Sequence, residues 1–388
     1  MKIAYFMSTI LEQGGGMEKY LIEAAENMSK YPEVQADVIT MDNKFTTRLI
    51  KTLSFYYFKK IESKYIHHES LRSIIKKLGD ANYIKCHNLS TLKKTLQMYD
   101  VIYAKNELLD SFMLGQLLGF NQLPPIVFGV HTPIYFPEAQ TGQAKLHNLL
   151  YSSVVYKFLL RGAKAIHTIN TDDMRICKRL FPTKKVYKIT NSFNCSKFIN
   201  NKNGVKYNFK FDNQKFNIFW SGRLTKEKGA YELFEMINSI NMNGYSDKVC
   251  WNIAGVGDAK EQLLELKKQH ANINYFDYVE NRYVASILAN IDLFISTSHY
   301  ETFGFAMIEA QSMNVPVFSF KTSGAEEIVI PNQTGIIVQN KAQFIEEIIR
   351  FVNGKHRFNK INQQVCYKFQ PEVISNQSLK MFKNVCDK

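Results

Sequence analysis

The chain has 388 residues, of which 45% are hydrophobic and 13% aromatic, and its formal net charge is +14. This length favours two or three domains, and the composition excludes a disordered chain because enough apolar surface is available for burial. A membrane-spanning helix is not expected, since no run of about 18 uncharged apolar residues occurs.

The positive charge is concentrated in the first half of the chain. Residues 1–195 have a balance of +10, and the remaining residues have a balance of +4. We therefore expect an anionic partner at the first half, with nucleic acid, an acidic membrane surface and a phosphorylated acceptor as candidates.

The six cysteines stand singly, with no C-x-x-C pair and no zinc-like spacing, which fits a reduced cytosol. Cys86 and His87 could supply two metal ligands, but nothing nearby in the sequence completes a set. A structural role is therefore favoured for these two residues.

Short apolar runs alternate with helix-length segments along the chain, the pattern of a parallel sheet covered by helices on both faces. The first residues are interrupted too soon, by Glu12 and a glycine run, for a secretory signal, and we interpret them as a first strand. The first half is predicted to form a helix at Glu18–Ser29 and strands at Lys2–Phe6, Ala36–Thr40, Val101–Ala104, Ile126–Val130, Ala165–Thr168 and Val186–Ile189.

The segment Arg48–His68 differs from its surroundings because lysines and arginine interleave with aromatic and aliphatic residues. This composition is typical of a basic amphipathic helix that lies on a membrane surface. A core helix with lysines on its solvent face has the same pattern. Both interpretations stay open from sequence.

The second half repeats the alternation. Strands are predicted at Asn217–Trp220, Val249–Ala254, Ile273–Phe276, Leu293–Thr297, Val317–Ser319 and Gly335–Val338, and helices at Gly229–Asn238, Lys260–His270, Tyr283–Ala289, Phe305–Met313 and Ala342–Val352. A segment rich in Asn, Lys and Gly at residues 200–204 interrupts the pattern. We expect an α/β chain of two Rossmann-like doubly wound domains, residues 1–195 and 196–370, with a carboxy-terminal helix over 371–388 that packs back on the first.

A glycine run, Gln13–Lys19, follows the first predicted strand and precedes a helix. Backbone amides at glycine can close on a diphosphate, although an ordinary tight turn would use the same residues. The run is not G-x-G-x-x-G, and no acidic residue is placed to bind a ribose, so a dinucleotide fingerprint is not supported.

A second candidate site follows the strand that opens the second half, at Trp220–Gly229. Arg223 and Lys228 are two fixed cations five residues apart, and together they can hold a diphosphate without a metal. Each could also be an ordinary surface charge.

A third candidate site is Ser296–Ala310, where a predicted strand ends, a loop contains Glu301, and Gly304 precedes a helix that contains Glu309. The first amides of that helix would point at an anion, and the two carboxylates can accept hydrogen bonds from sugar hydroxyls. This combination is difficult to explain by packing alone.

With these motifs, the sequence resembles the retaining glycosyltransferases of family four, which have the GT-B fold. The resemblance covers nearly the whole chain. It depends on the order and spacing of several motifs: G-G-x-E-[RK] at Gly15–Lys19, G-R-L-x-x-E-K-G at Gly222–Gly229, A-G-x-G at Ala254–Gly257, and E-x7-E at Glu301–Glu309, together with the segments Val315–Val317, Gly324–Val329 and Thr334–Val338.

The resemblance implies a role for individual residues. Arg223 and Lys228 would bind the donor diphosphate and stabilise the leaving nucleotide, Glu309 would hold the ribose hydroxyls, and Glu301 would lie near the donor sugar. His131 matches a histidine near the reacting sugar, although a histidine at a strand end is often structural. The implied donor-binding residues are Gly15, Gly16, Gly222, Gly255, Gly257, Thr302, Phe303, Gly304, Phe305 and Glu309.

Two residues depart from the family pattern. Ser192 stands where glycine is usual, after Asn191, and Asp277 replaces the glycine common after the Ile273–Phe276 strand. These departures concern the loops around the nucleotide base and not the class of enzyme.

The resemblance implies that a hexose or N-acetylhexosamine moves, with retention, from a nucleotide-diphosphate sugar to a glycan or lipid-linked acceptor, across a cleft between the domains. The sequence contains no D-x-D motif, so neither a metal nor a cofactor is expected. The expected location is the cytoplasm, with peripheral binding to an anionic membrane surface through Arg48–His68.

Two other classes stay open from sequence. The net charge would fit a nucleic-acid-binding protein, although no known binding module is recognisable. A sugar-nucleotide epimerase or a phosphorylase could have the same architecture.

Overall fold

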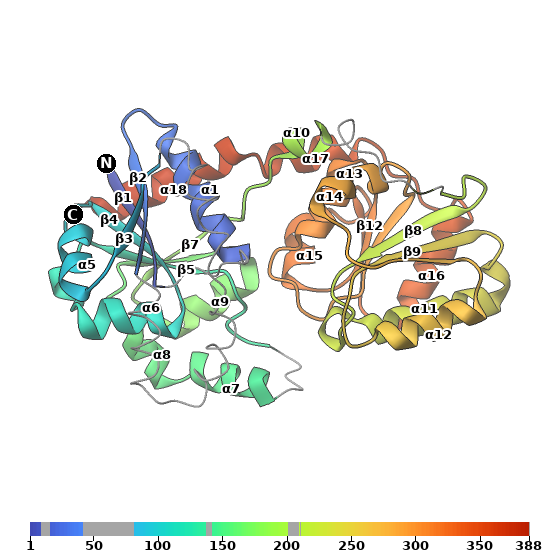
Figure 1. Ribbon diagram of the computed structural model, residues 1–388, viewed down its shortest axis with the longest axis horizontal. Coiled ribbons are helices and arrows are strands. Elements are labelled where there is room, and N and C mark those ends of the chain that lie inside the picture. The colour runs from blue at the N-terminus through green and yellow to red at the C-terminus, as the bar shows by residue number, and fades with distance from the viewer. Residues whose placement is uncertain (9–15, 42–80, 137–141, 201–208, 210, 388) are drawn as a thin grey trace. The chain divides into compact units, whose positions relative to one another are not determined.

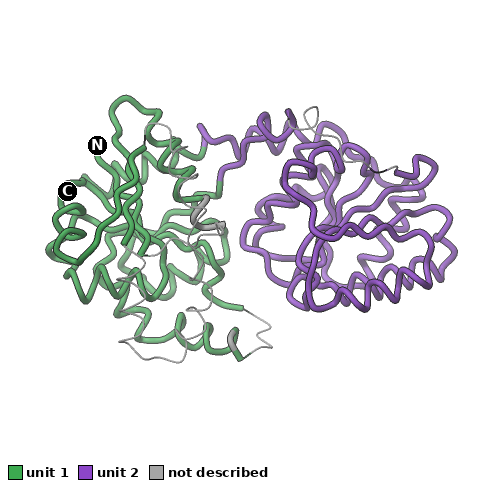
Figure 2. The backbone as a smooth tube through the Cα atoms, in the orientation of Figure 1, with its two compact units in different colours: residues 1–191, 374–388 green, residues 192–373 purple. Residues whose placement is uncertain are grey.

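We describe a computed structural model of the chain, in which residues 1–8, 16–41, 81–136, 142–200, 209 and 211–387 are placed (Figure 1). They form two compact units: unit 1 contains residues 1–191 and 374–388, and unit 2 contains residues 192–373 (Figure 2). The segment Arg48–His68 and Gly15 lie outside the described residues.

Unit 1 is built on a parallel sheet of seven strands in the order β3-β2-β1-β4-β5-β6-β7. From β1 the chain continues through β2 and β3 towards one edge of the sheet, and from β4 it continues through β5, β6 and β7 towards the other edge. The strand order therefore reverses between β1 and β4. The strands are β1 (Lys2–Met7), β2 (Gln35–Met41), β3 (Tyr83–Cys86), β4 (Val101–Lys105), β5 (Ile126–Val130), β6 (Ala165–Thr168) and β7 (Lys185–Lys188).

Helices cover both faces of this sheet (Figure 1). Asn88 and Asn170 begin two of them by accepting hydrogen bonds from the amides of Thr91 and Asp173, the usual function of an asparagine N-cap. The helices are α1 (Gly16–Ser29), α5 (Leu89–Leu96), α6 (Leu108–Phe112), η1 (Met113–Leu117), η2 (Phe120–Gln122), α7 (Gly142–Tyr151), α8 (Val154–Leu159), α9 (Thr171–Leu180) and α18 (Pro371–Cys386).

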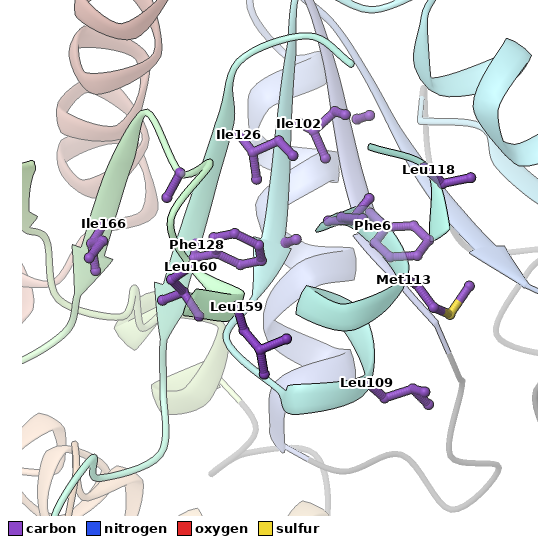
Figure 3. Close-up of a cluster of buried hydrophobic side chains, with 14 of the residues drawn as sticks. Phe6, Ile102, Leu109, Met113, Leu118, Ile126, Phe128, Leu159, Leu160 and Ile166 are labelled. Carbon is purple, nitrogen blue, oxygen red and sulfur yellow. The ribbon is translucent and has the colours of Figure 1, made fainter. Parts of the chain in front are cut away.

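The core of unit 1 lies on both sides of the sheet. On one side Phe6 and Phe128 pack among aliphatic residues of the neighbouring helices (Figure 3). On the other side the end of the chain returns to unit 1, and Phe382 of α18 packs edge-on against Tyr5 with ring centroids 6.2 Å apart. Burial of these side chains is the main force that holds α18 to the sheet.

Unit 2 contains a parallel sheet of six strands in the order β10-β9-β8-β11-β12-β13. Its strands are β8 (Phe216–Ser221), β9 (Val249–Ala254), β10 (Ile273–Phe276), β11 (Leu293–Ser296), β12 (Val317–Phe320) and β13 (Gly335–Val338). Its helices are α10 (Cys195–Asn200), η4 (Lys226–Lys228), α11 (Ala230–Ile240), η5 (Asn241–Tyr245), α12 (Lys260–Gln269), α13 (Asn281–Leu288), α14 (Phe305–Ser312), α15 (Ser323–Ile328), α16 (Lys341–Val352) and α17 (Ile361–Lys368).

The twelve predicted strands are all present, with bounds within one residue of the prediction. The strand β3, Tyr83–Cys86, was not predicted. Its residues are Tyr, Ile, Lys and Cys, and only Cys86 is fully buried, so no continuous apolar run indicates it. Among the residues that the structure places, no helix is both long enough and apolar enough to cross a bilayer.

Candidate functional site

The predicted cations and carboxylates of the second half lie in unit 2 at the carboxyl ends of β8 and β11. These two strands are neighbours, and the strand order reverses between them. In open α/β sheets, ligands bind in the crevice outside the carboxyl ends of the strands at such a reversal point. The fold therefore places the loops 222–229 and 297–304 where a ligand is expected.

Glycines allow the loops after β8 and β9 to pack backbone against backbone. Gly255 has φ 141°, and a Cβ there would lie 1.7 Å from the Gly222 carbonyl oxygen. A Cβ at Gly257 would lie 2.4 Å from the Leu224 carbonyl oxygen. These predicted glycines thus have a steric role in shaping the loops, and their contact with a ligand stays a prediction.

A threonine joins the two loops of the site. Thr297 Oγ1 accepts a hydrogen bond from Nε1 of Trp220 at 2.9 Å and donates one to the carbonyl oxygen of Lys228 at 3.0 Å. Gly229 follows with φ 68°, and a Cβ there would lie 1.8 Å from the Thr297 carbonyl oxygen. The backbone of Lys228 is therefore held against the end of β11.

Lys228 and Glu301 form an ion pair, with Nζ 2.8 Å from Oε2. Their side chains are 28% and 24% exposed, so both charges are within reach of a ligand. Arg223 is exposed and makes no ion pair with the described residues. The structure thus brings together Lys228 and Glu301, 73 residues apart, and leaves the Arg223 side chain at the surface.

Gly304 begins the helix α14 with φ 97°, a conformation that favours glycine. No side chain caps this helix start, so its first amides are available to an anion. Gly324 donates its amide hydrogen to the Glu301 carbonyl oxygen at 2.6 Å, which holds the loop before α14.

The remaining predicted residues lie around this helix start. Phe303 is buried and Phe305 is exposed, whereas Thr302 and Glu309 are half-buried and have polar partners within the chain. Phe303 therefore contributes packing to the loop, and the other three present polar or aromatic groups at its surface.

The predicted residues of the first half lie in unit 1. Gly16 is the first residue of α1, and His131 follows β5. His131 is half-buried, and its ring centroid lies 4.1 Å from that of Tyr20. Burial, followed by the neighbouring His167, holds the pKa of His131 well below its usual value, so the ring is neutral at pH 7.

Two groups of residues at these sites were given no role of their own from the sequence. Thr297 and Trp220 tie Lys228 into the fold, and Tyr103 and His167 contact each other beside His131. His167 could have been noticed from sequence, because it is a titratable residue inside the predicted strand Ala165–Thr168. Nothing in the sequence indicates the partner of Thr297.

Comparison with known proteins gives matches in both sequence and structure. Residues 205–365 match the family described as glycosyl transferases group 1. The capsular polysaccharide biosynthesis glycosyltransferase CapM of Staphylococcus aureus is 30% identical over 192 residues, 47% of this chain and 50% of that protein. The O-antigen biosynthesis glycosyltransferase WclY of Escherichia coli is 21% identical over 309 residues, 76% of this chain and 81% of that protein.

The chain spans about half the length of several curated relatives that it matches. Among solved structures, Anabaena Alr3699/HepE in complex with UDP has a TM-score of 0.69 at 17% identity and covers 99% of this chain and 100% of that one. The lipopolysaccharide outer core galactosyltransferase WaaB, in its apo form, has a TM-score of 0.70 at 13% identity and the same coverage. These likenesses confirm the predicted α/β class with two Rossmann-like units of the GT-B fold.

Proposed function

Because residues 205–365 belong to the glycosyl transferases group 1 family, we propose that this protein is a glycosyltransferase of cell-surface polysaccharide synthesis. The relatives named for capsular and O-antigen biosynthesis support this assignment. In this proposal a hexose or N-acetylhexosamine moves, with retention, from a nucleotide-diphosphate sugar to a glycan or lipid-linked acceptor. UDP is the first nucleotide to test, since a structural neighbour was solved with it.

The observation that supports the proposal best is the Lys228–Glu301 pair beside the uncapped start of α14. A departing nucleoside diphosphate accumulates negative charge, and an enzyme accelerates transfer by stabilising that charge. Lys228, Arg223 and the first amides of α14 would supply this stabilisation. Preorganised charges of this kind do not have to reorient during the reaction.

The ion pair also indicates how a donor would enter the site. Ion pairs that solvent can reach contribute roughly 0.2–1 kcal/mol, so a diphosphate can displace the carboxylate from Lys228 at small cost. Glu301 would then be free to accept a hydrogen bond from a sugar hydroxyl. In the same proposal the leaving phosphate accepts the proton of the acceptor, and chelation of divalent metals should leave the rate unchanged.

We also propose that the acceptor lies at an anionic membrane on the cytoplasmic side. One surface of unit 1 supports this part of the proposal. The helices α7 and α8 expose apolar side chains, with Leu149 67%, Val154 80% and Phe158 50% exposed. The guanidinium of Arg161 lies 3.7 Å from the ring centroid of Phe158, and residues 142–164 contain four Lys or Arg and no Asp or Glu. Apolar side chains with a basic border are typical of surfaces that bind anionic lipid.

Vesicle flotation tests this surface. Val154→Gln with Phe158→Gln should weaken binding to vesicles with anionic lipid, because both the exposed apolar area that would enter the lipid and the stacking of Arg161 on Phe158 are lost. Met242→Gln is the matched control, since Met242 is 78% exposed but lies in unit 2. Equal binding of both variants would contradict a membrane role for α7 and α8.

Transfer itself is tested with labelled UDP-, GDP- and ADP-sugars. A donor should raise the melting temperature of the protein, and label should appear in a saccharide acceptor. An epimerase would return a changed nucleotide sugar, and a phosphorylase would require inorganic phosphate. Salt-sensitive binding of DNA or RNA without any sugar transfer would support the nucleic-acid alternative instead.

A further inference from the structure

Two cysteines of unit 2 that are far apart in the chain meet in the fold. Cys195 is the first residue of α10, and Cys366 lies in the last turn of α17. Both are free thiols, and they are hydrogen-bonded to each other. The Phe193 amide donates a hydrogen bond to the Phe369 carbonyl oxygen at 2.7 Å, so the backbone before α10 is held against the backbone after α17 (Figure 1).

The surroundings of this cysteine pair are well packed. The helices α10 and α17 both pack against α14. Phe369 is fully buried, and its ring packs edge-on against that of Phe303 with centroids 5.6 Å apart. Nζ of Lys368 donates a hydrogen bond to the Glu327 carbonyl oxygen at 2.5 Å. These contacts fix the end of α17, and with it the position of Cys366 next to Cys195.

The two thiols differ in exposure and in acidity. Cys195 is 5% exposed, whereas Cys366 is half-buried. The hydrogen bond that the Cys195 thiol donates stabilises a thiolate at Cys366 and lowers the pKa of Cys366. The same hydrogen bond, followed by burial, raises the pKa of Cys195. Because the thiolate is the nucleophilic form of cysteine, Cys366 is the thiol that reacts first.

The other four cysteines are less reactive. They are Cys86, Cys177, Cys250 and Cys386, and burial raises the pKa of each thiol. Protonated thiols exchange slowly with disulfides. The reaction is therefore expected to be selective for Cys366.

We propose that Cys195 and Cys366 are a redox modification site, at which they form a reversible disulfide by exchange with a low-molecular-weight disulfide. The Cys366 thiolate attacks one sulfur atom of the small disulfide, which releases one small thiolate and leaves a mixed disulfide on Cys366. The Cys195 sulfur then displaces the second small thiolate. The protein sulfurs lose two electrons, which the small disulfide accepts, and the two thiol protons end on the released thiols. An excess of reduced small thiols reverses both steps, so the dithiol is the resting form in a reducing compartment.

The link encloses nearly all of unit 2. The chain enters this unit at Ser192 and leaves it after Val373. Residues 195–366 contain all six strands of its sheet and both loops of the candidate site, 222–229 and 297–304. A cross-link that closes so long a loop restricts the unfolded chain and thereby stabilises the folded state. The strands of unit 1 lie outside the loop, so oxidation stabilises unit 2 and not unit 1.

Peptide mapping of the full-length protein tests the link. The protein is incubated with oxidised glutathione at neutral pH, the remaining thiols are alkylated, and the digest is measured by mass spectrometry. We expect one peptide pair joined through Cys195 and Cys366, which dithiothreitol separates, while the other cysteines are alkylated. Free thiols at both positions, or cross-links spread over several cysteine pairs, would overturn the proposal.

Single variants separate the roles of the two thiols. Cys195→Ala should keep glutathione on Cys366, because no second thiol displaces it. Cys366→Ala should leave Cys195 unmodified, since this thiol is buried and keeps its proton. The matched control is Cys386→Ala, because Cys386 is also half-buried but lies in unit 1, and this variant should form the link as the parent does. Glutathione on Cys195 in the Cys366 variant would show that the order of attack is wrong.

Tryptophan fluorescence measures the effect on unit 2. The chain contains two tryptophans, Trp220 on β8 and Trp251 on β9, and both are buried in unit 2. Oxidation should raise the thermal midpoint of this signal by about 5–10 °C in the parent and in Cys386→Ala, and should leave it unchanged in Cys366→Ala. A linked protein without this rise would contradict the stabilisation of unit 2. No nucleotide sugar is used, so the result is independent of the proposed function.

Discussion

The two units place different chemistry at the same kind of position, the carboxyl ends of parallel strands. In unit 2 the groups are charged and about a quarter exposed, namely the Lys228–Glu301 pair beside the start of α14. In unit 1 the groups are neutral and buried, namely Tyr103 and His167 behind His131. The comparison shows that one architecture can support an electrostatic site built from loops and a hydrogen-bond chain built from strands.

The largest effect is expected from the charge of unit 2. Lys228→Ala should lower kcat/KM for transfer by about 100- to 1,000-fold, because the ammonium stabilises charge that develops as the diphosphate leaves. Steady-state kinetics with a labelled donor measure this. Lys226→Ala is the control, since Lys226 is exposed in the same turn, η4. Unchanged turnover of the Lys228 variant would show that the diphosphate assignment is wrong.

The close contact between the backbones of Gly255 and Gly222 in unit 2 should be nearly as sensitive to substitution, although no charge is involved. Gly255→Ala places a methyl group 1.7 Å from the Gly222 oxygen at a positive φ, and should lower the free energy of unfolding by about 3 kcal/mol. Gly244→Ala has a similar φ problem, at 83°, but nothing within 4 Å, and should lose about 1 kcal/mol. Denaturant unfolding curves compare the two, and equal losses would remove the steric argument.

Unit 1 should instead be sensitive to acid. The pKa of His167 is about 4 in the folded protein and about 6.5 in the unfolded chain, so the unfolded state binds the proton first. The stability contributed by neutral His167 is present above pH 6.5 and is lost as the pH falls towards 4, by up to about 3 kcal/mol. Unfolding free energies of the parent and of His167→Gln, measured between pH 7 and 4, should converge. If the difference between the two unfolding free energies stayed constant over this pH range, a buried neutral His167 would be contradicted.

The smallest effect is expected from Thr297, whose hydrogen bonds form a bridge between the loops 222–229 and 297–304 of unit 2. Thr297→Val keeps the side-chain volume but leaves Nε1 of Trp220 and the Lys228 oxygen without their partner, at a cost of about 1–2 kcal/mol. We expect a several-fold higher KM for the donor, because Lys228 is held less firmly. Thr297→Ser keeps the hydroxyl and should behave like the parent in thermal unfolding and in kinetics. A Val variant indistinguishable from the Ser variant would mean that the bridge does not position Lys228.

Much of the fold follows from local sequence, because a strand buried on both faces needs a short apolar run and a loop that meets another backbone needs glycine. The twelve predicted strands and the glycines of 222–229 and 254–257 are of this kind. The strand β3 was not predicted because only Cys86 in it is fully buried.

The partners of the polar side chains were decided only by the tertiary structure. Lys228 meets Glu301 because β8 and β11 are neighbours although two strands separate them in the chain, and Tyr103 meets His167 across the glycine of β5. Local periodicity determines which residues are buried, but strand order and the space left by Gly129 determine which of them touch. For this reason the candidate residues could be named from the sequence, whereas the Lys228–Glu301 ion pair and the contact between Tyr103 and His167 could not.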